Sequence, residues 1–356
     1  MLFFHREEGA ACMIYFNSDY TEGAHESILE ALTRTNLEQT PGYGTDDYCR
    51  AAAQRIRTLC ADDTLDVHFL VGGTQTNATV ISAALRGHQG VISADTGHIH
   101  VHETGAVEAT GHKVLAIPHE NGKITAAQVE QVWRTHHEDD SAEHCVEPKM
   151  VYLSQPTEFG TLYSKEELEA ISEVCRRCGM YLFADGARLG YGLAAADSTL
   201  DFPAMARLCD VFYIGGTKMG ALFGEAVVIR NAELKPAFRY YMKRHGGMLA
   251  KGRLLGLQFD ALLKDALYLR MGRHADELAD LIRDALRKNN IPLVMENRTN
   301  QVFAILTEEQ LQKLSATFVL SEQGKTADGK HLVRLCTSWA TKKENVEMLV
   351  EHLNQL

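Results

Sequence analysis

The stretch Tyr181-Leu-Phe-Ala-Asp-Gly-Ala-Arg188 joins a short apolar run to a polar end that contains glycine. The same combination recurs at Val67-His-Phe-Leu-Val-Gly-Gly-Thr-Gln75 and at Val211-Phe-Tyr-Ile-Gly-Gly-Thr-Lys218. Short apolar runs of this kind are typical of buried strands in a parallel sheet. Ligands of open α/β sheets bind beyond the carboxyl ends of the strands. We therefore expect these polar ends, together with Asp95-Thr-Gly-His98, to form one site.

Helical stretches separate the apolar runs between residues 50 and 230, which predicts an α/β fold with a mostly parallel sheet between two layers of helices. The expected strands are 67–71, 91–92, 113–117, 150–153, 181–184, 211–214 and 226–229, and the expected helices are 50–60, 75–85 and 166–178. Residues 254–289 read as a long amphipathic helix, followed by a strand (302–306), a helix (308–314), a strand (332–336) and a closing helix (342–353). We therefore expect an N-terminal extension (1–16), a large domain (17–250) and a small C-terminal α+β domain (251–356).

The composition is that of an ordinary globular protein, with 45% hydrophobic and 23% charged residues. The net charge of -11 gives no electrostatic reason to bind nucleic acid or anionic lipid. No apolar run approaches the roughly 20 residues of a spanning helix, and the start of the chain is not apolar enough for an export signal. The eight cysteines are scattered, which favours a reducing, cytoplasmic location. Cys175-Arg-Arg-Cys178 falls in an expected helix, and we interpret it as two ordinary helix residues rather than a redox pair.

The segment Gly72-Gly-Thr-Gln-Thr-Asn77 follows an expected strand and opens an expected helix. Glycines allow close approach of the backbone, and the free N–H groups of a helix N-terminus suit a phosphate group. The simpler alternative is a glycine turn in which Thr74 caps the helix. The segment lacks the lysine spacing of a nucleoside-triphosphate loop and is not a dinucleotide-binding G-x-G-x-x-G.

Asp185 and Lys218 each follow an apolar strand, where solvation is expected to be poor. A carboxylate in such a place needs a partner, which is either Arg188 or a protonated pyridine nitrogen of a cofactor. A buried lysine has a lowered pKa and therefore a neutral, nucleophilic amine. The structural alternative for Lys218 is a hydrogen bond to the end of a helix.

The histidine-rich segment His98-Ile-His-Val-His102 offers a different chemistry. On a strand, His98, His100 and His102 share one face and form a candidate metal site, which would make the protein a metallohydrolase. On a helix, His98 and His102 pair while His100 points away. The residues that follow favour a helix that continues to about Thr110, and we therefore predict no metal site.

Taken together, these motifs resemble the threonine aldolase and β-eliminating lyase group of fold-type I enzymes that depend on pyridoxal 5'-phosphate. The matching pieces occur in the family's order: Asn17-Ser-Asp19, Gly42-Tyr-Gly44, Gly73-Thr-Gln75, His98 with Glu103, Ala184-Asp-Gly-Ala-Arg188, Thr217-Lys218, Gly246-Gly-Met248 and Val333-Arg-Leu335. Each piece is short, but the ordered set covers nearly the whole chain. The resemblance implies the fold-type I transferase-like architecture, with a seven-stranded sheet in the large domain.

The resemblance also implies a cofactor site, whose residues are Gly73, Thr74, Gln75, His98, Asp185, Arg188, Thr217, Lys218 and Lys251. In this assignment, Lys218 carries the cofactor as a Schiff base and Asp185 binds its ring nitrogen. His98 stacks on the cofactor ring. Lys251 substitutes for an arginine that many members of the family place after Gly-Gly-Met, where this chain has Leu249.

The implied substrate is an amino acid whose carboxylate is held by Ser18, Arg188 and Arg334, because a bidentate guanidinium group suits a carboxylate. Tyr43 is expected near the cofactor of a neighbouring subunit, since members of the family are homodimers or homotetramers with shared sites. One departure concerns the family's second active-site histidine, because this chain has Glu158 at that position.

The working hypothesis is cleavage of a β-hydroxy-α-amino acid of the threonine or allo-threonine type to glycine and an aldehyde. Lys218, His98 and Glu158 are the expected catalytic residues. The Glu158 substitution keeps β-elimination and transamination open as alternatives with the same cofactor. A non-catalytic cofactor-binding protein is a further alternative. Such a protein would not need Arg188 and Arg334, the two arginines assigned to the substrate carboxylate.

Overall fold

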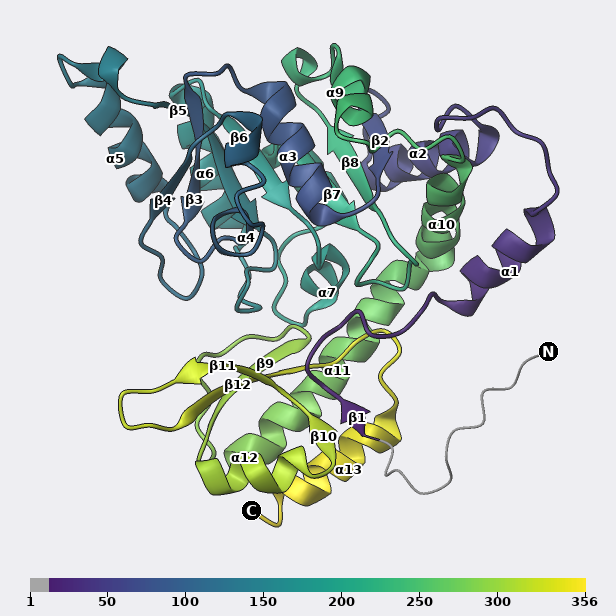
Figure 1. Cartoon of the computed structure of the whole chain (residues 1–356), viewed down its shortest axis with the longest axis vertical. Coiled ribbons are helices and arrows are strands. Elements are labelled where there is room, and N and C mark those ends of the chain that lie inside the picture. The colour runs from purple at the N-terminus through teal and green to yellow at the C-terminus, as the bar shows by residue number, and fades with distance from the viewer. Residues whose placement is uncertain (1–12) are drawn as a thin grey trace.

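The computed structural model describes residues 13–356, so the greater part of the expected N-terminal extension lies outside the described residues. A large domain and a small domain lie one above the other, joined by the long helix α11 (Leu267–Lys288) (Figure 1). The strands of the large domain are β2 (Asp66–Leu70), β3 (Gln89–Ala94), β4 (Val114–Ile117), β5 (Glu147–Ser154), β6 (Tyr181–Asp185), β7 (Val211–Gly215) and β8 (Glu225–Ile229). They form one seven-stranded sheet in the order β2-β8-β7-β6-β5-β3-β4. β8 pairs antiparallel with both of its neighbours, and the other pairs are parallel, which confirms the predicted mostly parallel sheet.

Helices cover both faces of this sheet (Figure 1). The larger ones are α1 (Glu26–Thr35), α2 (Asp47–Cys60), α3 (Gly73–Ala84), α5 (Ala126–His137), α6 (Lys165–Arg177) and α10 (Arg253–Leu263), and the shorter ones are α4 (His98–Val101), α7 (Leu189–Ala194), α8 (Phe202–Leu208) and α9 (Phe238–Arg244). Neighbouring strand residues contribute to different cores, because side chains alternate across a sheet. Leu182 packs in one core and Phe183 in the other. This double burial is the reason for the uninterrupted apolar runs.

The small domain contains an antiparallel sheet in the order β11-β12-β9, built from β9 (Gln301–Leu306), β11 (Ser321–Lys325) and β12 (His331–Cys336). The helices α11 (Leu267–Lys288), α12 (Glu308–Ser315) and α13 (Lys343–Leu353) complete this domain. The short strand β1 (Ile14–Tyr15) pairs in parallel with β10 (Phe318–Val319), and Phe16 is buried in the core of the small domain. The start of the described chain is therefore part of the C-terminal domain.

Two expectations about helices were wrong. The helix expected over 254–289 is interrupted, because Asp265 and Ala266 adopt left-handed backbone angles (φ 50° and 56°) that separate α10 from α11. The helix expected from His98 to about Thr110 stops after one turn, at Val101, and continues as turns and a short 3₁₀ segment. Within residues 13–356, no helix is both long and apolar enough to cross a membrane.

Candidate active site

A cavity lies beyond the carboxyl ends of β6 and β7, beside the first turn of α3. It brings together eight of the residues that were predicted from the sequence: Gly73, Thr74, His98, Glu158, Asp185, Arg188, Thr217 and Lys218. The strand ends therefore meet as expected, because parallel strands place their carboxyl ends at one edge of the sheet. Ser154, Tyr213 and Glu225 also line the cavity and were not predicted.

Asp185 is the last residue of β6, and its side chain is held by three hydrogen bonds. Its Oδ2 accepts from the Tyr152 hydroxyl group at 2.5 Å and from Asn77 Nδ2 at 3.2 Å. Its Oδ1 accepts from the backbone N–H of Ala187 at 2.9 Å. Three donors fix the position of the carboxylate, so Asp185 is suited to bind a cationic group in the cavity.

Lys218 lies in the turn after β7, where it is half-buried and lines the cavity. Its amine makes no hydrogen bond and no ion pair with other residues of the described part of the chain, and its Nζ lies 5.9 Å from the centre of the Tyr20 ring. Burial lowers the pKa of Lys218, and the nearby charge of Arg188 lowers this pKa further, while Asp19, Asp185 and Glu225 act in the opposite direction. An amine with a lowered pKa that no hydrogen bond or ion pair occupies in the described residues is available as a nucleophile.

The helix α3 begins next to this lysine and offers free backbone N–H groups. Gly72 is the N-cap residue, and no side chain caps the helix. Thr74 was considered as a possible cap, and the structure does not place it in that role. A Cβ atom at Gly73 would come within 3.3 Å of the Tyr213 hydroxyl group, so a glycine keeps this approach open. The uncapped helix N-terminus provides the donor groups that a phosphate requires.

His98 is connected to Asp185 through two buried side chains. Its Nδ1 lies 2.8 Å from Glu103 Oε1, and Asn77 Nδ2 donates to the same oxygen at 2.7 Å. Asn77 also donates to Asp185, which closes the connection. Because Nδ1 is occupied by Glu103, Nε2 is the ring nitrogen that is left for a ligand in the cavity.

Glu158 occupies the position where the resemblance implied a histidine. Its Oε1 accepts from the Ser154 hydroxyl group at 2.6 Å and from the backbone N–H of His98 at 2.9 Å. Burial raises the pKa of Glu158, and the negative charge of Asp185 raises it further, whereas the two hydrogen bonds lower it. The net result is a pKa above that of an ordinary glutamate, which makes the carboxylate a stronger base than an exposed one.

Arg188 is paired with Asp19, a buried residue that the sequence analysis left without a role. Arg188 Nε donates to Asp19 Oδ2 at 2.6 Å, and its Nη2 donates to Asp19 Oδ1 at 2.9 Å. Asn300 Nδ2 donates to Asp19 Oδ2 at 2.9 Å from the small domain. This carboxylate therefore joins both domains, and it leaves Nη1 of Arg188 free of partners within residues 13–356.

Five predicted residues do not line this cavity. Ser18 is buried next to Asp19, and Arg334 Nη2 donates to the Asn17 carbonyl group at 3.2 Å. Gln75 bridges two backbone segments, since its Oε1 accepts from Val71 N and its Nε2 donates to the His245 carbonyl group. The other two, Tyr43 and Lys251, lie on another part of the surface.

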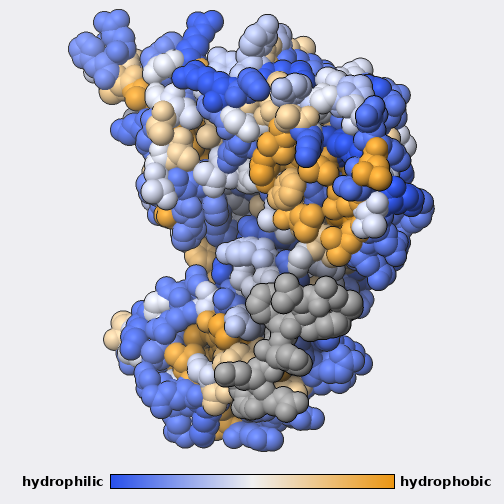
Figure 2. All heavy atoms as spheres, turned by 45° about the vertical axis from the view of Figure 1, so that its right-hand side comes forward, coloured by the Kyte–Doolittle hydropathy of each residue, from blue (hydrophilic) through white to orange (hydrophobic). Residues whose placement is uncertain are grey.

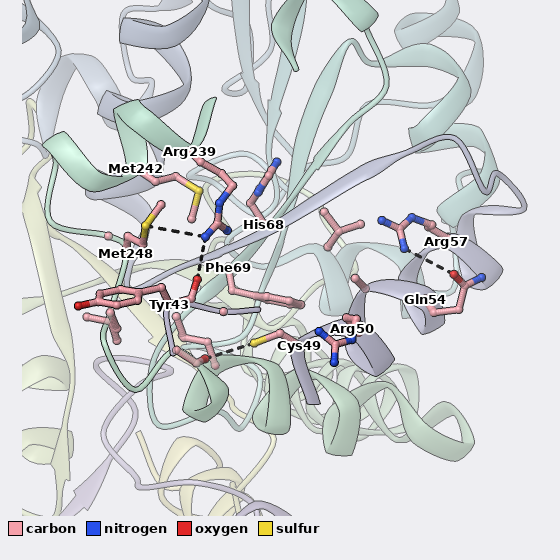
Figure 3. A pocket seen from close by; sticks show the side chains of 17 residues that line it. Tyr43, Cys49, Arg50, Gln54, Arg57, His68, Phe69, Arg239, Met242 and Met248 are labelled. Carbon is pink, nitrogen blue, oxygen red and sulfur yellow. Dashed lines mark hydrogen bonds between the residues drawn. The ribbon is translucent and has the colours of Figure 1, made fainter. Parts of the chain in front are cut away.

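Tyr43 lines a second pocket, between α2, β2 and α9 (Figure 3). Its backbone carbonyl accepts from Arg239 Nη2 at 2.9 Å, and its N–H donates to the Ala250 carbonyl group at 3.2 Å. These bonds hold Tyr43 in a left-handed conformation (φ 61°) with its side chain 48% exposed. Lys251 is exposed in the adjoining segment.

The histidine segment forms a single helical turn in which the rings of His98 and His102 lie 5.6 Å apart. His100 is exposed. No group of three or more histidine, cysteine, aspartate or glutamate residues in the described chain is arranged to hold a metal ion.

The fold and the cavity define a class of protein: a fold-type I enzyme that depends on pyridoxal phosphate. The cavity fits this cofactor, with a lysine that forms no hydrogen bond or ion pair within residues 13–356 for its aldehyde, a fixed carboxylate for its ring nitrogen and an uncapped helix N-terminus for its phosphate. An aspartate aminotransferase from Thermus thermophilus shares the fold, with a TM-score of 0.71 over 97% of this chain and 92% of that chain. Its sequence identity is 15%, so this likeness concerns the fold alone.

A model of the β-eliminating lyase family matches residues 16–309, and the chain belongs to this family. A low specificity L-threonine aldolase from Pseudomonas aeruginosa is 30% identical over 344 residues, which cover 95% of this chain and 96% of that protein. The structure of a Leishmania major threonine aldolase has a TM-score of 0.93 and 44% identity, and the match covers 96% of this chain and 99% of that chain. These findings confirm the predicted cofactor and the predicted class, a carbon–carbon lyase that depends on pyridoxal phosphate.

Proposed function

We propose that the cavity cleaves a β-hydroxy-α-amino acid of the threonine or allo-threonine type to glycine and an aldehyde. The observation that carries this proposal is the position of Glu158, a half-buried glutamate with a raised pKa that lines the same cavity as Lys218. Cleavage of the Cα–Cβ bond requires a base for the β-hydroxyl group. A β-elimination or a transamination has no such requirement.

Pyridoxal phosphate, when bound, supplies the electron sink for a carbanion at Cα. The amine of Lys218 would hold the cofactor as its nucleophile. Asp185, fixed by Tyr152 and Asn77, would pair with the ring nitrogen. The first turn of α3, at Gly73 and Thr74, would bind the phosphate through backbone N–H groups.

Arg188 and Arg334 are proposed to orient the amino acid by its carboxylate. Asp19 occupies Nε and Nη2 of Arg188, which lines the cavity, so this guanidinium is oriented before the substrate arrives. Arg334 and Ser18 do not line the cavity, and we propose that they complete the grip from the neighbouring segment, where Arg334 Nη2 donates to the Asn17 carbonyl group. With the carboxylate fixed, Glu158 removes the proton of the β-hydroxyl group, and the Cα–Cβ bond then breaks.

The placement of Tyr43 and Lys251 supports a homo-oligomer with shared sites, a homodimer or homotetramer. Both residues lie outside the cavity of their own chain: Tyr43 lines the second pocket (Figure 3), and the exposed Lys251 precedes Gly252, which lines the same pocket. Figure 2 shows hydrophobic side chains gathered on one face of the large domain. A second copy that covers such a face could place Tyr43 and Lys251 against the cofactor of its neighbour. We also propose a cytoplasmic location, since each of the seven cysteines in the described residues is a free thiol.

The test of this function is an analysis of products from threonine and allo-threonine with the purified enzyme. Glycine and an aldehyde are expected in equal amounts. A keto acid with ammonia would refute aldol cleavage in favour of elimination. Lys218→Ala should abolish both products and the visible absorption of the cofactor, whereas the exposed Lys313→Ala is the matched control and should behave as the wild type.

Glu158 is tested separately from Lys218. Glu158→Gln should lower kcat by about two orders of magnitude or more, as expected for loss of a general base, without removing the cofactor. Glu158→His restores the residue type implied by the resemblance and should recover part of the activity. A Gln variant with unchanged kcat would show that another group, such as His98, is the base.

A further inference from the structure

Glu225 is a buried carboxyl group in the active-site cavity that has no role in the reaction described above. It is the first residue of β8, the strand that runs antiparallel to its neighbours, and it pairs with Gly215 at the end of β7. The turn that follows Gly215 carries Lys218. The topology therefore brings Glu225 to the same end of the sheet as the reactive lysine.

One oxygen of Glu225 is used within the protein and the other is not. Oε1 accepts from the Thr217 hydroxyl group at 3.0 Å, and the Thr217 oxygen in turn accepts from the backbone N–H of Gly224 at 3.0 Å. Oε2 is buried and has no hydrogen-bond partner in the described chain. A buried carboxyl oxygen without a partner costs free energy. A glutamine would keep the bond from Thr217 but would carry no charge.

The charge of Glu225 depends on Lys218, and the reverse is also true. Burial raises the pKa of Glu225 to about 8, while the positive charge of Lys218 lowers it and the negative charge of Asp185 raises it. Glu225 in turn raises the pKa of Lys218. The other titratable groups that face Glu225 are Tyr213 and Tyr268, and burial raises the pKa of both far above neutral, so they stay uncharged. Lys218 is therefore the cation to which Glu225 responds.

We propose that Glu225 is a positioning residue that sets the proton affinity of the Lys218 amine through the charge of its carboxyl group. No ion pair joins the two side chains in the described chain, so Glu225 acts across the poorly solvated cavity rather than by contact. When Glu225 is ionised it favours the protonated amine, and when it is protonated it favours the neutral amine. It thereby determines the pH range in which Lys218 can bond to the cofactor and release it. This inference rests on the proposed role of Lys218.

The experiment compares Glu225→Gln and Glu225→Asp with the wild-type holoenzyme. Each protein is titrated with base, and the midpoint of the change in the visible absorption of the bound cofactor is measured. Loss of a neighbouring negative charge is expected to lower this midpoint by about one pH unit or more in the Gln variant. The Asp variant keeps the charge and should stay close to the wild type.

Two outcomes would overturn the proposal: an unchanged midpoint in Glu225→Gln, or an equal shift in both variants, since the latter would show an effect of packing alone. If the Gln variant does not retain the cofactor, the midpoint is measured in the cofactor-free proteins by competitive acylation of Lys218 and mass spectrometry. In the cofactor-free proteins, the midpoint for acylation of Lys218 is expected to be lower in the Gln variant than in the wild type. An unchanged midpoint would refute the proposal. A wild-type protein without visible absorption would contradict the role of Lys218 instead, so the two failures are distinguishable.

Discussion

Substitution of Asp19 by asparagine should destabilise the protein far more than an equivalent change at the surface. Asp19 is fully buried and accepts hydrogen bonds from Arg188 and Asn300 on its two oxygens. Asparagine keeps one acceptor oxygen and presents an amide group to the donors at the other position. Breaking a buried ion pair by removing one partner costs about 3–5 kcal/mol, because the remaining charge is left uncompensated.

The pH dependence of this cost follows from the pKa of Asp19. Burial by itself would raise this pKa, but the charges of Arg188 and Lys218 and the hydrogen bonds from Arg188 and Asn300 lower it below the ordinary value. An aspartate whose pKa is lower in the folded state contributes stability above its unfolded pKa, and this contribution is lost as the pH falls through the folded pKa. The full cost should therefore be present at neutral pH and persist in mild acid, near pH 5.

The assay is urea unfolding of the cofactor-free proteins, followed by circular dichroism at neutral pH and near pH 5. Asp284→Asn is the matched control, because Asp284 forms an exposed ion pair with Arg287 one turn along α11. Exposed pairs of this kind contribute little, so the control should unfold like the wild type. Asp19→Asn should also raise the KM for the amino acid, since Arg188 loses the partner that orients it. Equal midpoints for the two variants would refute the reasoning.

Three further predictions concern other buried groups. Burial lowers the pKa of His68 from 6.5 to about 4. Between these two pH values the unfolded chain binds a proton that the folded protein does not. The free energy of unfolding should therefore fall by about 3 kcal/mol as the pH falls from about 6.5 towards 4. His68→Gln should remove this loss in urea titrations across that pH range, and an unaltered pH dependence would exclude His68 as its source. Tyr152→Phe removes a donor to the charged Asp185 and should weaken cofactor binding by about 1.5–3 kcal/mol, measured as a dissociation constant, and an unchanged constant would contradict this. Gly186→Ala would place a Cβ atom 1.9 Å from the Tyr213 carbonyl oxygen and should prevent normal folding, so a wild-type melting temperature would disprove the clash.

The sequence predicted the large-domain sheet well because each strand combined an apolar run with a glycine-containing end. Asp185 and Lys218 were found by this signal, and they lie in the same cavity. The position of the helix break at Asp265 and Ala266 could not be predicted, because neither residue type favours a left-handed backbone as glycine does. The helix α10, which ends at this break, packs against α1 and α2.

The supporting residues of the site were harder to find than its reactive ones. Asn77 and Tyr152 lie inside a helix and a strand, and nothing in their immediate neighbours distinguishes them from core residues. One signal was available: Tyr152 and Ser154 are two apart on β5 and so share a face, which is the face that reaches Asp185. Glu225 showed a similar signal, because a glutamate at the start of an apolar strand is unusual.

The position of Tyr43 and Lys251, outside the cavity of their own chain, has a consequence for genetics. If neighbouring copies exchange these residues, a chain without Lys218 and a chain without Lys251 are defective in different parts of the same site. A mixed pair of the two would contain one site that lacks both residues and one site that has both. Two inactive alleles expressed together should therefore complement each other within the assembly.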